Sequence, residues 1–339
     1  MAIFHLHASI IGRSDGRSAV AAAAYRAGAD MTDPDTGTRH DYTRKRGVRA
    51  TYMEVPEAAP AWAADRPTLW AAVHAKETRK NSRLSREIRL ALPAELDNAG
   101  QAELVRTWAR DHLTAAGIVA DIAIHEPSRE GDDRNAHAHI MTTLRRFDPA
   151  TADGWAKGAA RDLNDKAFLE GLRASWEAAQ NAALEAAGSA ARVDHRSLEA
   201  QRADALAAGD DLLAAALDRP PEPHLGITAQ AIDRRAGEPV SDRGRALAEV
   251  RETRSRLLQA YDHARRAAAI IADTATEAAA TLTGRPARAR SGTGHGDRLA
   301  RMFGLGRYAA TDAAPVAPAA EPPASPSPEP DDPDEPSWS

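Results

Sequence analysis

Two apolar, β-rich runs of this sequence carry histidines at spacings that suit metal binding. His137 and His139 lie two residues apart in the second run, and His125 lies near the end of the first. Alternate residues of a strand point to the same face, so the imidazoles of His137 and His139 share one face. If the runs pair as a hairpin around residues 126–136, His125 lies opposite His137, with Cβ atoms about 5 Å apart. Three imidazoles could then bind a divalent cation and leave coordination positions open for a substrate oxygen.

An isolated His-x-His pair on a strand is more often half-exposed surface than a ligand set. His5 and His7 have the same spacing near the N-terminus, but no third histidine flanks them. We therefore interpret them mainly as residues of a first strand, with His5 as a candidate for the lining of the site. The additional His125 is what distinguishes the later cluster as a predicted metal centre.

A tyrosine, Tyr25, lies near the end of a short predicted helix. Ser18 can cap the alanine-rich run AVAAAAYRA, and Gly28 can end it in the left-handed conformation that glycine adopts readily. Taken alone, a tyrosine in such a helix is more often a packed side chain than a nucleophile.

The elements that must position these residues are typical of an α/β (α+β) domain. Residues 2–11 alternate apolar and polar side chains, which predicts a half-buried strand, and residues 86–93 predict a second strand that ends at Pro93. Helical spacing recurs at about 98–116 and 160–187. We expect an antiparallel sheet that carries the histidines, with helices packed on it.

The chain is predicted to divide into a catalytic domain, a linker or extension, a long amphipathic helix and a disordered tail. Apolar residues recur at alternating three- and four-residue steps from Leu247 to Ile271, the seam of one helix. The last 29 residues hold seven acids, no bases and nine prolines, a composition that cannot bury enough apolar surface to fold. The predicted segments are 1–200, 201–240, 241–283 and a basic, then acidic and proline-rich tail at 284–339.

Composition restricts both the chemistry and the compartment. Cysteine is absent, so thiolate ligands and thiol nucleophiles are excluded, and a metal must bind histidine or carboxylate. The net charge is −5, but outside the acidic last 29 residues 44 bases face 42 acids, so bulk charge does not indicate a nucleic-acid partner. No segment has the pattern of a membrane span or a signal peptide, and we expect a cytoplasmic protein.

The histidine segment is part of a pattern that extends along the chain. IHEPSREGDDRNAHAHIMTTLR resembles the histidine motif of MobA/MobL relaxases, His-hydrophobe-His (HUH) endonucleases that process plasmid transfer origins. MAIFHLHASIIGRSDGRSAVAAAAYRAG is similar to the family's first strand and nucleophile helix. The blocks DYTRKRGV, RKNSRLSREIRLALPAEL and RVDHRSLEAQ follow in the family's order. In rolling-circle replication initiators the catalytic tyrosine follows the histidines, whereas here it precedes them, which favours a relaxase.

This resemblance implies a mechanism for nicking DNA. Tyr25 matches the nucleophile, and its attack on single-stranded transfer-origin DNA would leave a 5′-phosphotyrosine that permits later religation. Ionising a phenol at pH 7 costs about 4 kcal/mol, so something must offset the charge that develops. A cation on His125, His137 and His139 could do so. Imidazole ligands favour Mn²⁺, Co²⁺, Ni²⁺ or Zn²⁺ over Mg²⁺, whereas the family implies Mn²⁺ or Mg²⁺, so Mn²⁺ is the preferred ion.

Further candidate residues follow from the resemblance or from charge. By resemblance, Glu87 could orient a ligand histidine or accept the Tyr25 proton; it could equally be a carboxylate on the strand surface. Basic and aromatic side chains in residues 39–46 could contact phosphates and stack on a base, or form a solvated basic loop. These are Arg39, Tyr42, Arg44, Lys45 and Arg46. The block Arg192–Ser197 has no assigned role, and a salt bridge or DNA contact is favoured there over a second metal site.

The expected partners are single-stranded transfer-origin DNA, relaxosome accessory proteins and a type IV coupling protein. No GxxxxGKS/T phosphate loop is present, so we expect a separate helicase to unwind the DNA. The helix at 241–283 is interpreted as a surface or dimerising helix. Three alternatives stay open: a rolling-circle-type replication initiator, a DNA phosphodiesterase that uses water with Tyr25 structural, and a DNA-binding accessory protein without activity.

Overall fold

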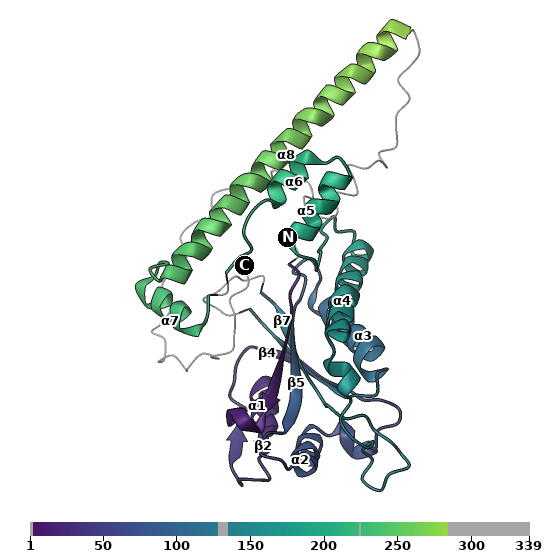
Figure 1. Ribbon diagram of the computed structural model, residues 1–339, viewed down its shortest axis with the longest axis vertical. Helices are drawn as coiled ribbons and strands as arrows, with labels where there is room; N and C mark the ends of the chain where they lie inside the picture. Colours follow the sequence, from purple (N-terminus) through teal and green to yellow (C-terminus); the bar gives the residue numbers. More distant parts are fainter. Residues whose placement is uncertain (1–2, 128–134, 224, 284–339) are drawn as a thin grey trace, which may run out of the picture. The chain divides into compact units, whose positions relative to one another are not determined.

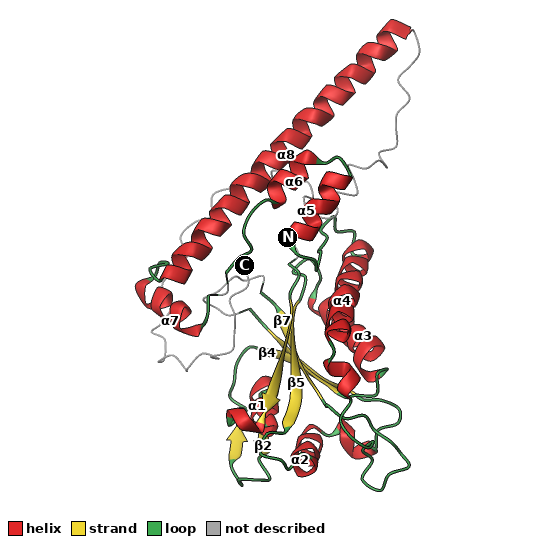
Figure 2. Cartoon of the chain, viewed as in Figure 1, coloured by secondary structure: helices red, strands yellow, loops and turns green. Residues whose placement is uncertain are grey.

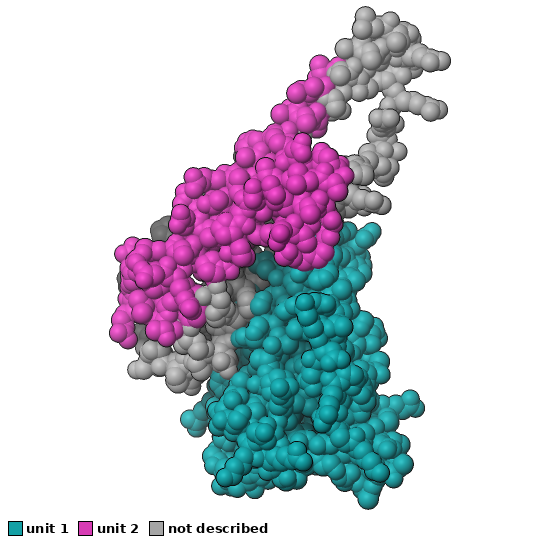
Figure 3. Space-filling view, viewed as in Figure 1, with its two compact units in different colours: residues 1–195, 298–304, 338–339 teal, residues 196–297, 305–337 magenta. Residues whose placement is uncertain are grey.

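The computed structural model describes residues 3–127, 135–223 and 225–283. These residues separate into two compact units, one ending at His195 and the other beginning at Arg196 (Figure 3). The tail at 284–339, predicted to be disordered, lies outside the described residues.

The first unit contains a five-stranded antiparallel sheet, a two-stranded ribbon and helices on both faces of the larger sheet (Figures 1 and 2). Its strands are β1 (Leu6–Gly12), β2 (Asp30–Thr32), β3 (Arg39–Asp41), β4 (Val48–Glu54), β5 (Arg83–Ala91), β6 (Ala120–His125) and β7 (His137–Thr142). Its helices are η1 (Arg13–Asp15), α1 (Ala19–Ala27), η2 (Ala61–Ala64), α2 (Arg66–Lys76), α3 (Asn98–Ala109), η3 (Arg110–Thr114), η4 (Arg161–Asn164) and α4 (Lys166–Ala186). This architecture confirms the predicted α/β (α+β) class.

The five strands have the order β1-β5-β7-β6-β4, and every neighbouring pair is antiparallel. One face packs against α3 and α4 in a core that includes Ile140 and Trp176. The opposite face packs against α1 and α2 in a core that includes Val20 and Trp70. Because helices cover both faces, β6 and β7 are buried at every position, including their histidines.

The alternation of side chains decides which face carries the histidines. Ala138 and Ile140 lie in the core beneath α3 and α4, so His137 and His139 point to the opposite face. Ile124 belongs to the same core, which turns the neighbouring His125 toward the opposite face as well. The three histidines and helix α1 therefore share one face of the sheet.

Helix α1 begins and ends at the residues that the sequence predicts. The Ser18 hydroxyl accepts a hydrogen bond from the Ala21 N–H at 3.2 Å, and Gly28 follows the helix with φ 61°. Ala23 and Ala24 are buried in the core between α1 and the sheet. Their small side chains allow the helix to lie close to the strands beneath it.

The second unit is helical where it is described. Its helices are α5 (Leu198–Ala207), α6 (Asp211–Leu217), α7 (Ile227–Ala236) and α8 (Asp242–Thr283). The long α8 helix covers nearly all of the stretch 241–283 that the sequence predicts to be one amphipathic helix. The segment 201–240, predicted as a linker or extension, contains α6, α7 and most of α5. Among the described residues, no helix is both long and apolar enough to cross a membrane.

Candidate metal centre and nucleophile

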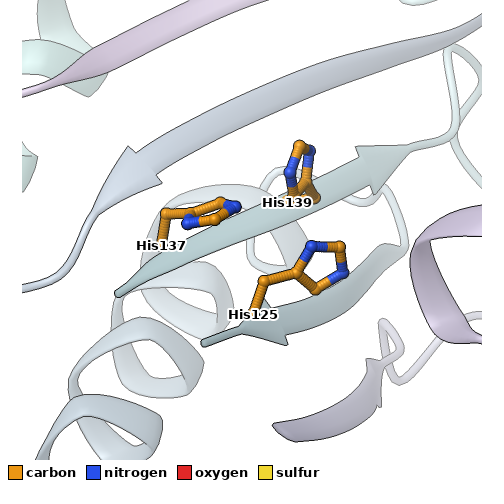
Figure 4. Close-up of side chains that lie close together, drawn as sticks. All are labelled: His125, His137 and His139. Carbon is orange, nitrogen blue, oxygen red and sulfur yellow. The ribbon is translucent and has the colours of Figure 1, made fainter. Parts of the chain in front are cut away.

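The three histidines meet at the centre of the sheet. The β6–β7 pairing puts His125 directly opposite His137, which confirms the predicted hairpin register. The ring centroids are 4.8 Å apart for His125 and His139, 5.4 Å for His125 and His137, and 5.3 Å for His137 and His139. One nitrogen from each ring lies within 4.8 Å of the other two, and Figure 4 shows the rings directed toward one another.

A hydrogen bond at the other ring nitrogen fixes the tautomer of each histidine. His125 Nε2–H donates to the main-chain carbonyl of Arg26 at 2.7 Å, so its lone pair is on Nδ1. His137 Nδ1–H donates to the Asn135 carbonyl at 2.9 Å, and His139 Nδ1–H donates to Glu87 Oε1 at 2.7 Å. The last two rings therefore have their lone pairs on Nε2. Such acceptors around a metal site orient the ligands and raise their basicity.

The histidine cluster is suited to a cation because the rings of His125 and His139 are neutral. Burial, with smaller contributions from His139 and Lys45, lowers the pKa of His125 to about 2. Burial also lowers the pKa of His139, against the opposing effect of Glu87. The Nε2 atom of His139 is buried without a hydrogen-bond partner among the described residues. A buried imidazole nitrogen that carries a lone pair and lacks a hydrogen-bond partner fits a metal ligand, since metals bind the neutral imidazole.

Glu87 lies beneath the cluster on β5 and is 3% exposed. It accepts hydrogen bonds from Arg26 Nε at 2.5 Å and from Arg26 Nη2 at 2.8 Å, in addition to the bond from His139. Burial raises the pKa of this carboxyl, but the His139 hydrogen bond and the Arg26 charge outweigh it and hold the pKa well below its ordinary value. An ionised, fully engaged carboxylate is a weak proton acceptor. The geometry therefore favours an orienting role for Glu87 over the role of a base.

Tyr25 is half-buried on α1, and two residues of the loop after β3 pack on its ring. The Tyr42 ring meets it edge-on, with centroids 5.1 Å apart and an interplanar angle of 89°. The Lys45 ammonium lies over its face, 3.4 Å from the centroid. These contacts fix the plane of the phenol and place a positive charge beside it.

The other basic residues predicted to bind DNA are not gathered at the tyrosine. Arg39 on β3 pairs with Asp30 and Asp41, and both Arg44 and Arg46 are exposed. Only Tyr42 and Lys45 of that set contact Tyr25 in the contacts observed. This difference could not be predicted from the sequence, because it depends on how the loop folds back over α1.

His5 and His7 lie on or beside the edge strand β1, with rings stacked 6.4 Å apart. His7 pairs in register with Arg89, which pairs with His139, so a row of three side chains runs from the sheet edge to the cluster. Neither His5 nor His7 belongs to the group of nitrogens that converge at the centre. The group that converges contains His125 together with the later His-x-His pair, and its role as a metal site stays a prediction.

Two further groups of acidic and histidine residues have internal partners instead. His74 Nε2 accepts from the Ala19 N–H at 3.1 Å, and its Nδ1 is 3.1 Å from Asp35, so the ring joins α2 to the start of α1. In the Arg192–Ser197 block, His195 pairs with Glu177 of α4 and packs against Phe4, with centroids 6.1 Å apart. Sequence favours a salt bridge or a DNA contact for this block over a second metal site, and both stay predictions.

Residues 17–235 match the model of the MobA/MobL family. The chain belongs to the MobA/MobL family. It is 37% identical over 267 residues to the mobilization protein MobL of Acidithiobacillus ferridurans, covering 70% of this chain and 65% of that protein. It is 33% identical over 303 residues to the probable mobilization protein MobA of Bifidobacterium longum, covering 78% and 49%. The chain thus spans less than two thirds of the length of either MobA/MobL relative.

A solved structure that bears on family membership is one described as the molecular basis of vancomycin resistance transfer in Staphylococcus aureus. It superimposes with a TM-score of 0.53 at 31% sequence identity, covering 58% of this chain and all of that one. Together with the family match, this likeness agrees with the predicted class of fold, an antiparallel sheet with helices packed on it.

Proposed function

We propose that this MobA/MobL protein nicks single-stranded transfer-origin DNA by transesterification, with Tyr25 as nucleophile and a divalent metal, Mn²⁺ or Mg²⁺, on the three histidines. The observation that carries the proposal is the hydrogen bond from His125 to the carbonyl of Arg26, the residue after Tyr25. It joins the tyrosine helix to the histidine cluster across 99 positions of the chain. A nucleophile and a metal centre held together in this way suit phosphoryl chemistry.

In this reaction the phenol oxygen of Tyr25 attacks the scissile phosphorus, and the bond from phosphorus to the 3′ oxygen breaks. The phenol proton is lost, the 3′ oxygen gains a proton, and the products are a 5′-phosphotyrosine and a 3′-hydroxyl. When bound, the metal supplies positive charge to the non-bridging phosphate oxygens. One phosphodiester replaces another, so attack by the 3′-hydroxyl on the phosphotyrosine restores the strand.

The protein's own residues orient the reacting groups. Tyr42 and Lys45 hold the Tyr25 ring, and the Lys45 ammonium lies where negative charge develops during attack. Glu87 holds the ring of His139 through Nδ1, so that Nε2 faces the centre of the cluster. A nucleophile fixed in the right orientation removes much of the entropic barrier to the reaction.

The decisive experiment incubates the purified protein and Mn²⁺ with an oligonucleotide labelled 3′ of the nick position. We expect a covalent protein–DNA adduct that survives denaturation in the wild type and is absent in Tyr25→Phe. Tyr52→Phe, which changes a tyrosine of β4, is the matched control and should form the adduct normally. Free 5′-phosphate products in both the wild type and Tyr25→Phe would instead show a phosphodiesterase that uses water. Binding without any cleavage under varied metals would favour an accessory protein.

A chain of this kind needs its substrate in single-stranded form. We therefore propose that a separate helicase unwinds the DNA, and that relaxosome accessory proteins and a type IV coupling protein act with this chain at the transfer origin. Pull-down of these proteins with the full chain, with and without transfer-origin DNA, tests the assignment.

A further inference from the structure

Arg26 contacts the site through both its side chain and its main chain. Its guanidinium is buried, with the side chain 6% exposed, and donates two parallel hydrogen bonds to Glu87. The third guanidinium nitrogen, Nη1, donates to the Ala22 carbonyl of the same helix at 3.2 Å. Its main-chain carbonyl accepts the hydrogen bond from His125. Arg26 thus holds His139 through Glu87 and holds His125 through its own carbonyl.

We propose that Arg26 is a positioning residue that sets the geometry between the nucleophile and the metal centre, through Glu87 to His139 and through its own carbonyl to His125. The proposal rests on the proposed function, because it assumes that Tyr25 and the histidines act together. Neither the sequence motif nor the family match assigns this role to Arg26.

The fork of Arg26 determines the orientation of Glu87. Two parallel N–H···O bonds between a guanidinium and a carboxylate fix the carboxylate plane as well as its position. Glu87 Oε1 then has one direction left for the His139 N–H, and this direction fixes the angle of the imidazole. A lysine has no planar fork, so it can supply the charge but not the orientation.

The same residue also fixes the position of helix α1. A helix of nine residues is marginal in water by itself, so its place on the sheet depends on tertiary contacts. Arg26 is anchored to the sheet, and the preceding residue, Tyr25, projects about 100° away around the helix. A shift at the anchor therefore displaces the phenol. Displacing a reacting group by about 1 Å can slow a reaction by about 100-fold.

A purely structural ion pair would have a different signature. Removing one partner of a buried ion pair is destabilising whether or not the pair positions the site, so a loss of stability alone does not reveal what Arg26 does. The test must measure metal affinity and reaction rate beside stability. The matched control is Arg86, a buried arginine of β5 on the opposite face that donates to Asn164 and touches none of the three histidines.

The experiment compares the wild type with Arg26→Met, Arg26→Lys and Arg86→Met. We measure Mn²⁺ affinity by isothermal titration calorimetry without DNA, adduct formation in a single turnover, oligonucleotide binding by fluorescence anisotropy, and Tm. Arg26→Met should weaken Mn²⁺ binding by about tenfold or more, and slow adduct formation by about 100-fold with unchanged oligonucleotide affinity. Arg26→Lys should recover only part of each loss. Arg86→Met should lower Tm and change neither metal affinity nor rate.

A double-mutant cycle with Glu87→Gln shows whether Arg26 acts through that carboxylate. The effects of Arg26→Met and Glu87→Gln on Mn²⁺ affinity should be clearly less than additive in the double variant. Full additivity, or an Arg26→Met protein with wild-type Mn²⁺ affinity and rate, would overturn the proposal. So would losses in Arg26→Met that Arg86→Met reproduces at equal Tm. If the wild type forms no adduct, the proposed function fails, but the Mn²⁺ affinities still decide whether Arg26 positions the histidines.

Discussion

Lys45→Met is predicted to slow the attack of Tyr25 on DNA by 10- to 100-fold, an estimate of about 1.5–3 kcal/mol. The Lys45 ammonium nitrogen lies 3.4 Å from the centroid of the Tyr25 ring, and that nitrogen is itself buried. From this position over the ring it is about 4 Å from the phenol oxygen, where charges interact by about 4 kcal/mol at an effective dielectric constant of 20.

Two deductions reduce this value. The ammonium already interacts with the neutral ring in the resting protein, which contributes about 1 kcal/mol and does not help the reaction. The Lys45 side chain is also only half-buried, so solvent and salt screen part of its charge. What remains is the stabilisation specific to the phenolate and to the charge gained by the phosphate.

The assay is adduct formation in a single turnover, with enzyme and Mn²⁺ in excess over a labelled oligonucleotide. Lys45→Arg keeps the positive charge and should react within a few-fold of the wild type. Lys157→Met removes an exposed positive charge between β7 and η4, outside the predicted DNA-binding residues, and should leave the rate unchanged. Oligonucleotide affinity is measured separately in each variant, because a lysine that only binds phosphate would change affinity without changing the rate at saturation. Equal rates for Lys45→Met and the wild type, or equal slowing by Lys45→Met and Lys45→Arg, would refute the electrostatic reasoning.

Three further predictions concern the metal, the nucleophile helix and the core. His137→Ala should lose adduct formation and most Mn²⁺ binding by calorimetry yet retain oligonucleotide binding; normal cleavage would exclude it as an essential ligand. Ser18→Ala removes the α1 N-cap and should reduce the free energy of unfolding by about 1 kcal/mol, measured in urea. Trp176→Ala empties a fully buried position and should reduce that free energy by about 3–5 kcal/mol. A Trp176 loss no larger than that of Ser18 would contradict the core assignment.

The convergence of the three histidines was predictable from the sequence because two local rules determine it. A period of two places His137 and His139 on one face, and a hairpin register brings His125 opposite His137. Both are properties of neighbouring stretches of chain joined by one loop. Helix α1 was predictable for a similar reason, since its capping residues, Ser18 and Gly28, are adjacent to it.

The supports of the site were not predictable in the same way because they join distant segments. Arg26 and Glu87 are 61 positions apart, and their contact depends on β5 lying beside β7 in the sheet. The spacing of apolar side chains along the chain does not reveal which strands are neighbours in the sheet. From the sequence, Glu87 could be an orienting carboxylate, a base or a surface residue, and the hydrogen bonds from Arg26 and His139 favour the first role. One signal was available, because an arginine is unusual on the buried side of an alanine-rich helix.

The two halves of the site differ in how firmly the fold holds them. The histidines lie on β6 and β7, which are buried at every position in the middle of the sheet, so they cannot move without disturbing the core. The tyrosine lies on a nine-residue helix whose place depends on an N-cap, the Arg26 contacts and the loop residues Tyr42 and Lys45. Changes in β6 and β7 should therefore act mainly on folding and metal binding, whereas changes around α1 should act mainly on reaction rate. In the proposed reaction the nucleophile stays covalently attached to DNA and later accepts attack by the free 3′-hydroxyl, so this difference would let the histidine cluster stay fixed while the phosphotyrosine adjusts.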